Sequence, residues 1–235
     1  MGAALGLPRV HLRRTDSTND RAREFALTGA PHGTLVTAAA QSAGRGRQGR
    51  HWSAPPGSSL LMSLVLRWPA SDRSPTLLPL VAAVAVCDAV GPDARIKWPN
   101  DILLGDGKLA GILVEGRPQQ GWAVLGIGVN VAVRTEELPA PLRALAATLG
   151  QGRETIEPFL AELLAALTRR LEEPRDRVLD AWRERDALRG REIAWAGGRG
   201  SADGVDAEGH LLVELPDGAQ IALAAGEVHL ESYNL

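Results

Sequence analysis

Two lysines are the residues of this chain whose type and spacing first point to chemistry. The 235-residue chain carries 26 lysines and arginines, but its lysines are just Lys97 and Lys108, eleven residues apart. An ammonium group is a compact point charge that fits between phosphate and carboxylate oxygens, unlike a planar guanidinium. A compositional bias toward arginine is the alternative explanation, but the closeness of the two lysines favours a shared site for an anionic substrate.

An arginine-rich segment is the second group suited to negatively charged ligands. Residues 41–57 read QSAGRGRQGRHWSAPPG, a long stretch between two predicted strands. Guanidinium forks bind phosphate and carboxylate bidentately, and glycine lets the backbone fold over a ligand. Residues 44–49 formally match G-x-G-x-x-G, but the prolines at 55 and 56 exclude the helix which that dinucleotide motif requires. We therefore predict a mobile loop that binds an anion, rather than a plain surface loop.

Two glycine-bearing segments favour a groove beside these cations. Residues 107–115 (GKLAGILVE) and 126–130 (GIGVN) each place glycines inside an apolar strand. A glycine within a strand marks either a bulge or the close approach of another group, so the pair predicts a floor for a flat apolar ligand. Residues 97–101 (KWPND) end a strand in a turn, where Asn100 and Asp101 are polar tips able to hold a nucleotide phosphate through magnesium.

The elements that must position these groups alternate between short strands and helices. Closely spaced strands with glycine turns predict hairpins, and thus an α+β fold with a mixed, largely antiparallel sheet and flanking helices. We expect helices that begin near Ser17, as a capping residue, and at Pro75. Further helices are expected at 141–149, 156–172 and 175–188. The strands are expected at 8–13, 33–40, 58–68, 95–98, 102–104, 109–115 and 121–131.

The composition changes after Gly190. Short strands between glycine and aspartate turns follow, which is typical of a small β-barrel of about fifty residues. We therefore predict a catalytic domain over 1–188 and a C-terminal barrel over 189–235.

Composition excludes several classes of protein. The net charge of −2 argues against bulk capture of nucleic acid, and the apolar run at 77–87 is too short for the roughly 20 residues of a membrane span. The N-terminal charges follow the apolar part, the reverse of a secretory signal. The single cysteine, Cys87, excludes a disulfide framework, and the five histidines form no metal-spaced pair. We expect a cytoplasmic protein. Of the five histidines, we expect only His51 to lie near the site.

Five motifs in order carry a resemblance to a known family. DSTN at 16–19, Gln41 with GRGRQGRHW at 44–52, KWPND, GKLAGILVE and GIGVN together resemble the biotin–protein ligase (biotin–[acetyl-CoA-carboxylase] ligase) family. The resemblance covers residues 16 to 131 and extends more loosely to the end, where the family carries an SH3-like β-barrel. Because the first motif begins at residue 16, it leaves no room for the DNA-binding domain of bifunctional members, and no DNA or membrane partner is expected.

The resemblance implies a two-step reaction. The carboxylate of biotin attacks the α-phosphate of MgATP, which gives biotinyl-5′-AMP and pyrophosphate. A lysine of a biotin carboxyl carrier protein, or of the equivalent domain of a biotin-dependent carboxylase, then takes the biotinyl group and releases AMP. A homodimer is compatible with the apolar strands.

Roles for individual residues also follow from the resemblance. Ser17, Thr18 and Gln41 would hydrogen-bond the ureido ring of biotin, while Lys108 would bridge its carboxylate and the α-phosphate. Mg²⁺ would enter mainly with the ATP phosphates, with Asp101 as a candidate ligand, and Lys97 would brace the sheet. The implied catalytic residues are Lys108, Arg47 and Asp101. The implied biotin-binding residues are Ser17, Thr18, Asn19, Gln41, Gly44, Arg45, Gly46, Arg47, Lys108, Gly111, Ile112, Leu113 and Gly126. The implied ATP- and adenylate-binding residues are Arg45, Arg47, Trp52, Asn100, Asp101, Lys108 and Asn130.

Two alternatives stay open. A lipoate or octanoate ligase or transferase shares the catalytic fold. In such an enzyme an acyl chain would bind beside Ser17, Thr18 and Gln41 in place of the ureido ring. A non-catalytic biotin sensor is the other alternative. Lys108 and the arginine segment argue against a sensor, because binding a neutral ureido ring does not need so many cations.

Overall fold

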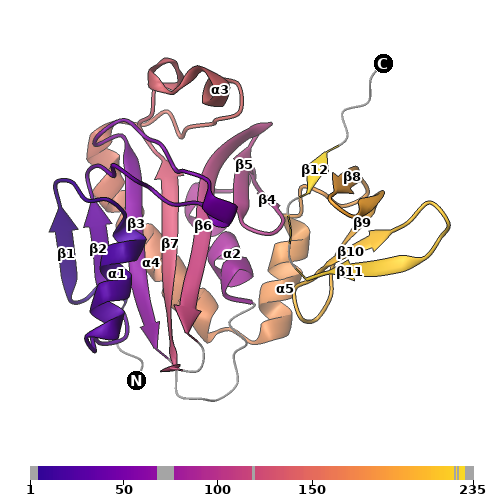
Figure 1. The fold of residues 1–235 in the computed structure, drawn as a ribbon, viewed down its shortest axis with the longest axis horizontal. Coiled ribbons are helices and arrows are strands. Elements are labelled where there is room, and N and C mark those ends of the chain that lie inside the picture. Colours follow the sequence, from indigo (N-terminus) through magenta and orange to yellow (C-terminus); the bar gives the residue numbers. More distant parts are fainter. Residues whose placement is uncertain (1–4, 68–76, 118–119, 225, 227, 231–235) are drawn as a thin grey trace.

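A seven-stranded sheet forms the body of the molecule in the computed structural model, which describes residues 5–67, 77–117, 120–224, 226 and 228–230 (Figure 1). The strand order is β1-β2-β3-β7-β6-β5-β4. β1 and β2 are parallel and all other neighbours are antiparallel, which confirms the expected mixed, largely antiparallel sheet. The strands are β1 (Arg9–Leu12), β2 (Leu35–Ala38), β3 (Ser59–Arg67), β4 (Ala94–Lys97), β5 (Asp101–Leu104), β6 (Gly107–Arg117) and β7 (Trp122–Asn130).

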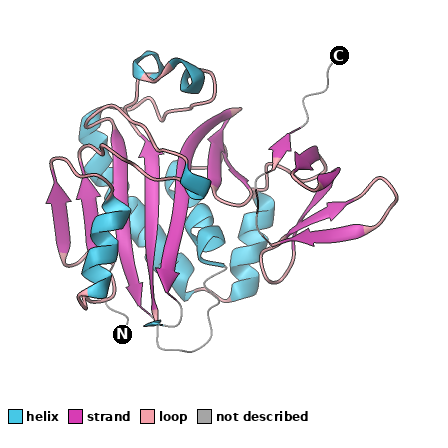
Figure 2. Ribbon diagram, viewed as in Figure 1, coloured by secondary structure: helices cyan, strands magenta, loops and turns pink. Residues whose placement is uncertain are grey.

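Helices cover both faces of this sheet (Figure 2). α1 packs on β2, β3 and β7, whereas α2 packs on β4, β5 and β6 and against α4 and α5. Alternating residues of β3 divide between the two cores, with Leu64 on the α2 side and Val65 on the α1 side. The helices are α1 (Thr18–Leu27), α2 (Leu78–Val90), α3 (Ala140–Arg143), α4 (Ile156–Glu172) and α5 (Arg175–Glu184), with 3-10 turns at Arg47–Gly49, Thr135–Glu137 and Arg153–Thr155.

The central strands of the sheet, β3 and β7, have nearly continuous apolar sequences because both of their faces are covered. β3 and β7 pair along their whole length, from Ser59 with Asn130 to Arg67 with Trp122. Strands covered on both faces read as nearly continuous apolar runs, because neither set of side chains faces water. α2 is likewise apolar except for Asp88 near its end, and it buries Cys87, whose pKa is raised to about 12 by burial. The thiol therefore behaves as a small core side chain.

Two expected helices differ from the structure for one physical reason. The helix expected at 141–149 is wrong beyond Arg143, because residues 145–147 pair with the start of β6 through Lys108. The helix expected to reach residue 188 ends at Glu184, because the chain then hydrogen-bonds to Ile96 of β4. In both cases pairing with a strand outweighs local helix propensity. The expected boundaries at Pro75 and Trp68 lie outside the described residues.

The predicted start of α1 at Ser17 is confirmed, but the expected capping by its side chain is wrong. Ser17 occupies the N-cap position, yet its side chain makes no capping hydrogen bond and is 1% exposed. The side chain of Ser17 is therefore buried without capping the backbone N–H groups at the start of α1.

A second sheet follows the helices. Its order is β11-β10-β9-β8-β12. The indole N–H of Trp98 donates to the carbonyl of Gly209 at 3.1 Å, and Gly209 (φ +83°) lies so close to Leu77 and Leu80 that a side chain there would touch both. The sheet is thus seated on α2 and on the turn after β4. Its strands are β8 (Glu192–Trp195), β9 (Gly198–Val205), β10 (Leu211–Glu214), β11 (Gln220–Leu223) and β12 (His229–Leu230).

The second small sheet fits the expected C-terminal architecture, but barrel closure and the domain boundary near 188 remain predictions. Within the described ranges, no helix is long and apolar enough to cross a membrane.

A partly buried aspartate lies between the end of α5 and the second sheet. Oδ1 of Asp186 accepts the N–H of Leu188 at 2.8 Å, and Oδ2 is buried without a hydrogen-bond partner among the described residues. Burial raises the pKa of Asp186 to about 6, against the backbone hydrogen bonds from Leu188 and Arg189, which lower it. Folding therefore favours the protonated form, so stability falls as the pH rises from about 4 to about 6 and stays reduced above that.

Asp186→Asn is expected to stabilise the protein in a pH-dependent manner, because it removes the buried charge and keeps the acceptor for Leu188. The free energy of unfolding should rise by about 2–3 kcal/mol near pH 8 and by less than about 1 kcal/mol near pH 4.5. Denaturant titrations of both proteins at the two pH values measure this difference. An equal effect at both pH values would contradict the assignment of the cost to ionisation of Asp186.

Candidate active site

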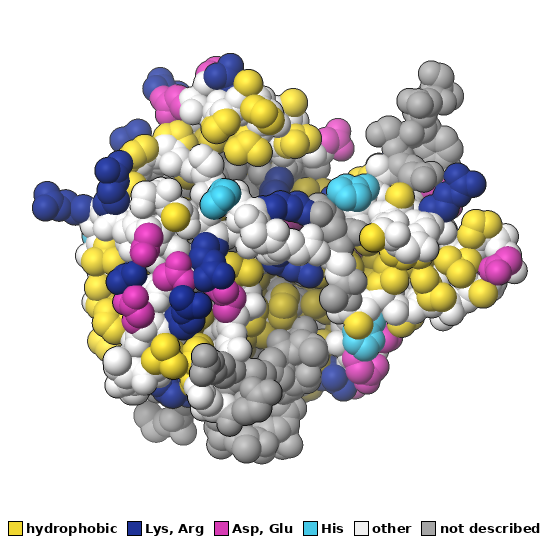
Figure 3. Space-filling view, viewed as in Figure 1, with side chains coloured by type: hydrophobic (Ala, Val, Ile, Leu, Met, Phe, Trp, Pro, Cys, Tyr) yellow, Lys and Arg dark blue, Asp and Glu magenta, His cyan; other side chains and the backbone are white. Residues whose placement is uncertain are grey.

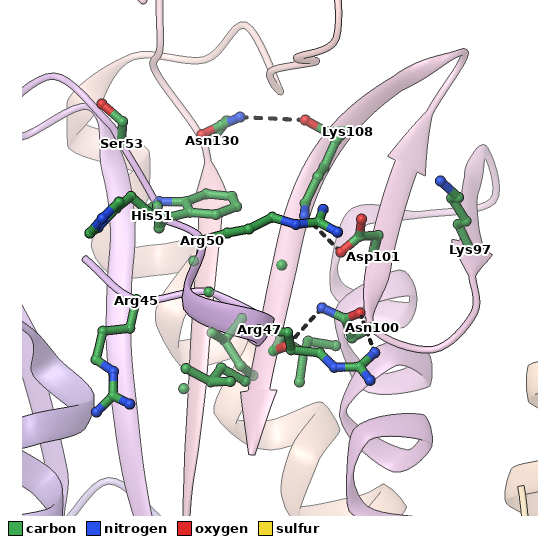
Figure 4. A pocket seen from close by; sticks show the side chains of 18 of the residues that line it. Arg45, Arg47, Arg50, His51, Ser53, Lys97, Asn100, Asp101, Lys108 and Asn130 are labelled. Carbon is green, nitrogen blue, oxygen red and sulfur yellow. Dashed lines mark hydrogen bonds and ion pairs between the residues drawn. The ribbon is translucent and has the colours of Figure 1, made fainter. Parts of the chain in front are cut away.

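An open cavity of about 520 Å³ lies over β6 and β7, beneath the segment 44–52 and beside the second sheet (Figures 3 and 4). Figure 3 shows lysine and arginine side chains around a hollow whose interior is apolar. The cavity brings together nearly all the residues selected from the sequence. Those that line it are Ser17, Thr18, Asn19, Gln41, Arg45, Gly46, Arg47, Trp52, Asn100, Asp101, Lys108, Gly111, Ile112, Leu113, Gly126 and Asn130.

Gly44 does not line the cavity. A Cβ at this position would lie 2.4 Å from the carbonyl oxygen of Trp52 and 2.9 Å from Nε2 of Gln41. Its lack of a side chain therefore serves the close return of the loop. The implied contact between Gly44 and biotin has no support from this geometry.

The segment 44–52, which we call the arginine loop, folds back on itself. Trp52 N–H donates to the carbonyl of Gly44, and Gly46 N–H donates to that of Arg50. A 3-10 turn at Arg47–Gly49 forms the tip. The side chain of Arg47 reaches across to the turn before β5, where Nη1 donates to Oδ1 of Asn100 at 3.1 Å (Figure 4). Burial lowers the pKa of Arg47, opposed by the nearby charge of Asp101.

The indole of Trp52 covers two glycines on neighbouring strands. Gly111 and Gly128 face each other in register. A Cβ would lie 3.0 Å from the ring at Gly111 and 2.7 Å from it at Gly128. The predicted glycine floor is thus present, with the indole above it. Nε1 of Trp52 is buried and has no hydrogen-bond partner in the described part of the chain. Gly128 was missed as a site residue, although the alternation of glycines in GIGVN was a signal for it.

Gly126 lines the cavity, and its lack of a side chain also leaves room for Asn19. Its implied contact with biotin stays a prediction. A Cβ there would lie 2.0 Å from Oδ1 of Asn19, so Asn19 occupies the space that a side chain at this position would need. Asn19 is 4% exposed. Its Oδ1 accepts from Ser63 Oγ at 2.6 Å, and its Nδ2 donates to Glu115 at 2.9 Å. Asn19 therefore anchors α1 to the sheet.

Thr18 and Gln41 meet at one end of the cavity. The backbone N–H and the hydroxyl of Thr18 both donate to Oε1 of Gln41, at 2.7 and 3.0 Å. Because Oε1 is committed to Thr18, the amide nitrogen of Gln41 remains as a donor. Ser17 lines the same end of the cavity.

Lys108 is held by its backbone at the other end. Its N–H donates to the carbonyl of Leu145 at 2.7 Å, and its carbonyl accepts from Ala147 at 2.9 Å. Nζ lies 2.7 Å from Oδ1 of Asp101, close enough for an ion pair but without hydrogen-bond alignment, and 5.9 Å from the Trp52 ring centre. The ammonium thus lies beside the carboxylate of Asp101 (Figure 4) and near the ring of Trp52.

Two asparagines implied as adenylate ligands bind the protein itself. Nδ2 of Asn100 donates to the carbonyl of Ile112 at 3.0 Å, and Nδ2 of Asn130 donates to that of Ala147 at 3.0 Å. These hydrogen bonds fix the strand ends that carry Lys108 and Asp101.

Lys97 lies on the same cavity as Lys108, so the structure places both lysines of the chain together. Burial lowers the pKa of Lys97; the carboxylate of Asp101 opposes this effect, and the cations Lys108 and Arg50 add to it. The site therefore concentrates positive charge.

The second sheet supplies residues that the sequence did not predict. His51 lines the cavity as expected, but the expectation that it is the one histidine there is wrong, because His229 of β12 lines it too. Val228 and Leu230 flank His229 on the same wall. No local pattern near His229 signals the site, because the contact joins segments far apart in the sequence. In the described ranges, no three His, Cys, Asp or Glu residues are grouped to hold a metal ion.

Comparison with known proteins identifies the class. The chain belongs to the biotin/lipoate A/B protein ligase family, whose model matches residues 11–131. It is 37% identical to the biotin–[acetyl-CoA-carboxylase] ligase of Paracoccus denitrificans, over 91% of this chain and 97% of that protein. It is 41% identical to the bifunctional ligase/repressor BirA of Bacillus spizizenii, over 57% of this chain but 44% of that protein, so it spans under half of this relative.

A solved structure agrees with these relatives. The biotin protein ligase from Aquifex aeolicus, in complex with biotin and ATP, superposes with a TM-score of 0.80 at 27% identity, and covers 95% of this chain and 98% of that one. The chain is thus grouped with the biotin–protein ligase enzymes, which confirms the resemblance and the fold class expected from the sequence.

Proposed function

We propose that this chain activates biotin with ATP as biotinyl-5′-AMP and transfers it to a lysine of a biotin carboxyl carrier protein or domain. The observation that carries the proposal is the placement of Lys108, fixed by its backbone and paired with Asp101, under an arginine loop and opposite the Thr18–Gln41 pair. One end of the cavity thus offers neutral hydrogen-bonding groups and the other offers cations. Biotin has the same polarity, with a neutral ureido ring at one end and a carboxylate at the other.

The ureido ring suits the end with Ser17, Thr18 and Gln41. A buried urea needs partners for both its N–H groups and its carbonyl oxygen. The amide nitrogen of Gln41 supplies a donor, and the hydroxyls of Ser17 and Thr18 can donate or accept. An acyl chain such as lipoate would leave these groups unpaired, which disfavours the lipoate alternative.

The cations suit the first chemical step. A carboxylate must approach a polyphosphate, and Lys108 and Arg47 offset their mutual repulsion. As the oxygen of biotin bonds to the α-phosphorus and pyrophosphate leaves, negative charge gathers on the phosphoryl oxygens. An ammonium between the two anionic groups stabilises that charge more than it stabilises the separate substrates. No covalent enzyme nucleophile is needed, in keeping with the burial of Cys87.

A magnesium ion fits the residues beside Lys108. Asp101 offers a carboxylate beside Lys108, and Asp106 lines the same cavity. Mg²⁺ in nucleotide sites is held by one or two carboxylates together with phosphates, so these residues could hold it while ATP supplies the other ligands. The ion would neutralise phosphate charge, while Lys108 and Arg47 orient the reacting oxygens.

The second step passes the biotinyl group to the carrier. The amine of a carrier lysine attacks the carbonyl carbon of the mixed anhydride, the bond from carbon to phosphate oxygen breaks, and AMP leaves. Closure of the arginine loop over the adenylate would exclude water until the carrier arrives.

The arginine loop is expected to be mobile without ligand and ordered with it. Residues 42–52 should exchange amide hydrogens rapidly in the free protein and at least about tenfold more slowly with biotin plus MgATP, because the loop must shield a hydrolysable anhydride. Hydrogen exchange with mass spectrometry measures this, with residues 59–67 of β3 as an internal reference. Equal exchange of the loop in both states would contradict its proposed closure.

Mass spectrometry of a purified carrier domain tests the proposed function. Incubation with this protein, biotin and MgATP should add one biotinyl group to one lysine, dependent on both ligands. Pyrophosphate release that depends on biotin but leaves the carrier unmodified would retain activation and reject that carrier. If neither product forms, the reaction is rejected; a rise in melting temperature with lipoate would then favour the lipoate alternative, and with biotin the sensor.

A further inference from the structure

Glu115 ends the motif that contains Lys108, yet it lies at the opposite end of the site and takes no part in the chemistry described above. Its two carboxylate oxygens have different partners. Oε1 lies 2.8 Å from Nη2 of Arg45 in the arginine loop, and Oε2 accepts from Nδ2 of Asn19 at 2.9 Å. Glu115 therefore joins the loop to the start of α1.

The loop side of this junction is an ion-pair cluster. Arg45 also binds Oδ1 of Asp20 at 2.7 Å, so two carboxylates hold one guanidinium. Partial burial lowers the pKa of Arg45, but Asp20 and Glu115 outweigh this effect and the net change is upward. Opposite charges gather over α1 and the neighbouring loop (Figure 3). In this arrangement Arg45 is directed away from Lys108 (Figure 4).

The other side of the junction is a buried hydrogen-bond chain. Ser63 Oγ lies 2.6 Å from Asn19 Oδ1 and 2.9 Å from Thr18 Oγ1, so one hydroxyl hydrogen has two possible acceptors. Thr18 in turn donates to Gln41. A ligand that changes the hydrogen bonds of Thr18 would therefore change how strongly the Ser63 hydroxyl donates to Asn19.

We propose that Glu115 is a positioning residue that couples occupation of the Thr18–Gln41 pocket to closure of the arginine loop. The inference rests on the proposed function, because it takes biotin as the ligand of that pocket. A carboxylate fits this place since it accepts from Asn19 and from Arg45 at once. The chain Gln41–Thr18–Ser63–Asn19–Glu115–Arg45 joins the ureido end of the cavity to the loop through contacts of 3.0 Å or less.

Glu115→Gln tests the coupling. A carboxylate accepts from Asn19 with one oxygen and from Arg45 with the other, whereas an amide has a single, uncharged acceptor oxygen and loses one of these contacts. Biotin without ATP should slow hydrogen exchange of residues 42–52 in the wild type. At biotin concentrations that saturate both proteins, this slowing should be at least fivefold smaller in the variant. Escape of biotinyl-AMP should be about tenfold faster, whereas single-turnover adenylation at saturating substrates should change less than about threefold.

Two further variants separate coupling from charge and from stability. Glu115→Asp keeps the charge but shortens the reach, and should lose the protection as Glu115→Gln does. Glu24→Gln removes a carboxylate of the same patch that pairs with Arg21 and not with the loop, and should behave as the wild type. Melting temperatures of all three show that each is folded.

The outcomes distinguish the coupling from the proposed function. Full biotin-dependent protection in both Glu115 variants would overturn the coupling, while carrier modification by the wild type would still support the ligase. Conversely, protection that is lost in both variants would support the coupling even if the wild type failed to form the adenylate. Loss of protection in Glu24→Gln as well would assign the effect to the charged patch and overturn the role of Glu115.

Discussion

Lys108→Ala is expected to lower biotin-dependent exchange between ATP and pyrophosphate by about a thousandfold or more while the fold remains intact. The side chain lies where the two anionic substrates must meet, and its backbone is clamped by Leu145 and Ala147. Truncation removes the charge without disturbing that clamp. The lost ion pair with Asp101 is partly exposed, so the free energy of unfolding should fall by less than about 1 kcal/mol.

The chain offers a matched control for this variant. Lys97 is its other lysine and lines the same cavity, but it lies on β4 at the edge of the sheet. Lys97→Ala should reduce exchange by no more than about tenfold, because it lowers the total positive charge without removing the group beside Asp101. Lys108→Arg should recover part of the rate, since a planar fork keeps the charge but not the compact shape.

Isotope exchange and denaturant unfolding of the three variants measure these effects. Near-normal exchange in Lys108→Ala would remove Lys108 from the mechanism. Equal losses in Lys97→Ala and Lys108→Ala would show that the cavity requires total charge rather than an ammonium at one position.

Gly126→Ala is expected to destabilise the protein and to weaken biotin binding together. The added Cβ would lie 2.0 Å from Oδ1 of Asn19, which is buried and held by Ser63 and Glu115. Because the amide cannot swing away without leaving those partners unpaired, the free energy of unfolding should fall by about 2–4 kcal/mol. Displacement of Asn19 also moves Thr18, so biotin affinity should fall at least about tenfold.

Gly128→Ala is the control for that prediction. Its added Cβ would meet the ring of Trp52 at 2.7 Å, but this ring belongs to a half-exposed loop residue that can shift. The free energy of unfolding should then change by less than about 1 kcal/mol, while retention of the adenylate weakens. Urea titration and calorimetric binding of biotin measure both variants. Unchanged stability of Gly126→Ala would show that Asn19 is not confined by the contact described.

Local sequence patterns were sufficient for most of the sheet and for the location of the site. The apolar runs of β3 and β7, the glycine turns around β5 and β6, and the Gly/Arg density of the arginine loop each depend on neighbouring residues. The same patterns failed at 144–149, where a contact with Lys108 outweighs helix propensity. They also gave no sign of the contact at Gly126, because nothing near it in the sequence shows that Asn19 occupies the space where a side chain would lie.

The sequence by itself determined the chemistry available to this protein: two lysines, an arginine loop, glycine-bearing strands and a polar segment at the start of α1. These follow from residue types and short spacings, which is also why five short motifs were enough to indicate the family. The tertiary structure decided which of these groups meet. Packing brings His229 to the cavity wall, pairs Lys108 with Asp101 and joins Glu115 to Arg45. Such contacts connect distant segments, and the packing that holds them is a property of the whole fold and not of any one stretch of chain.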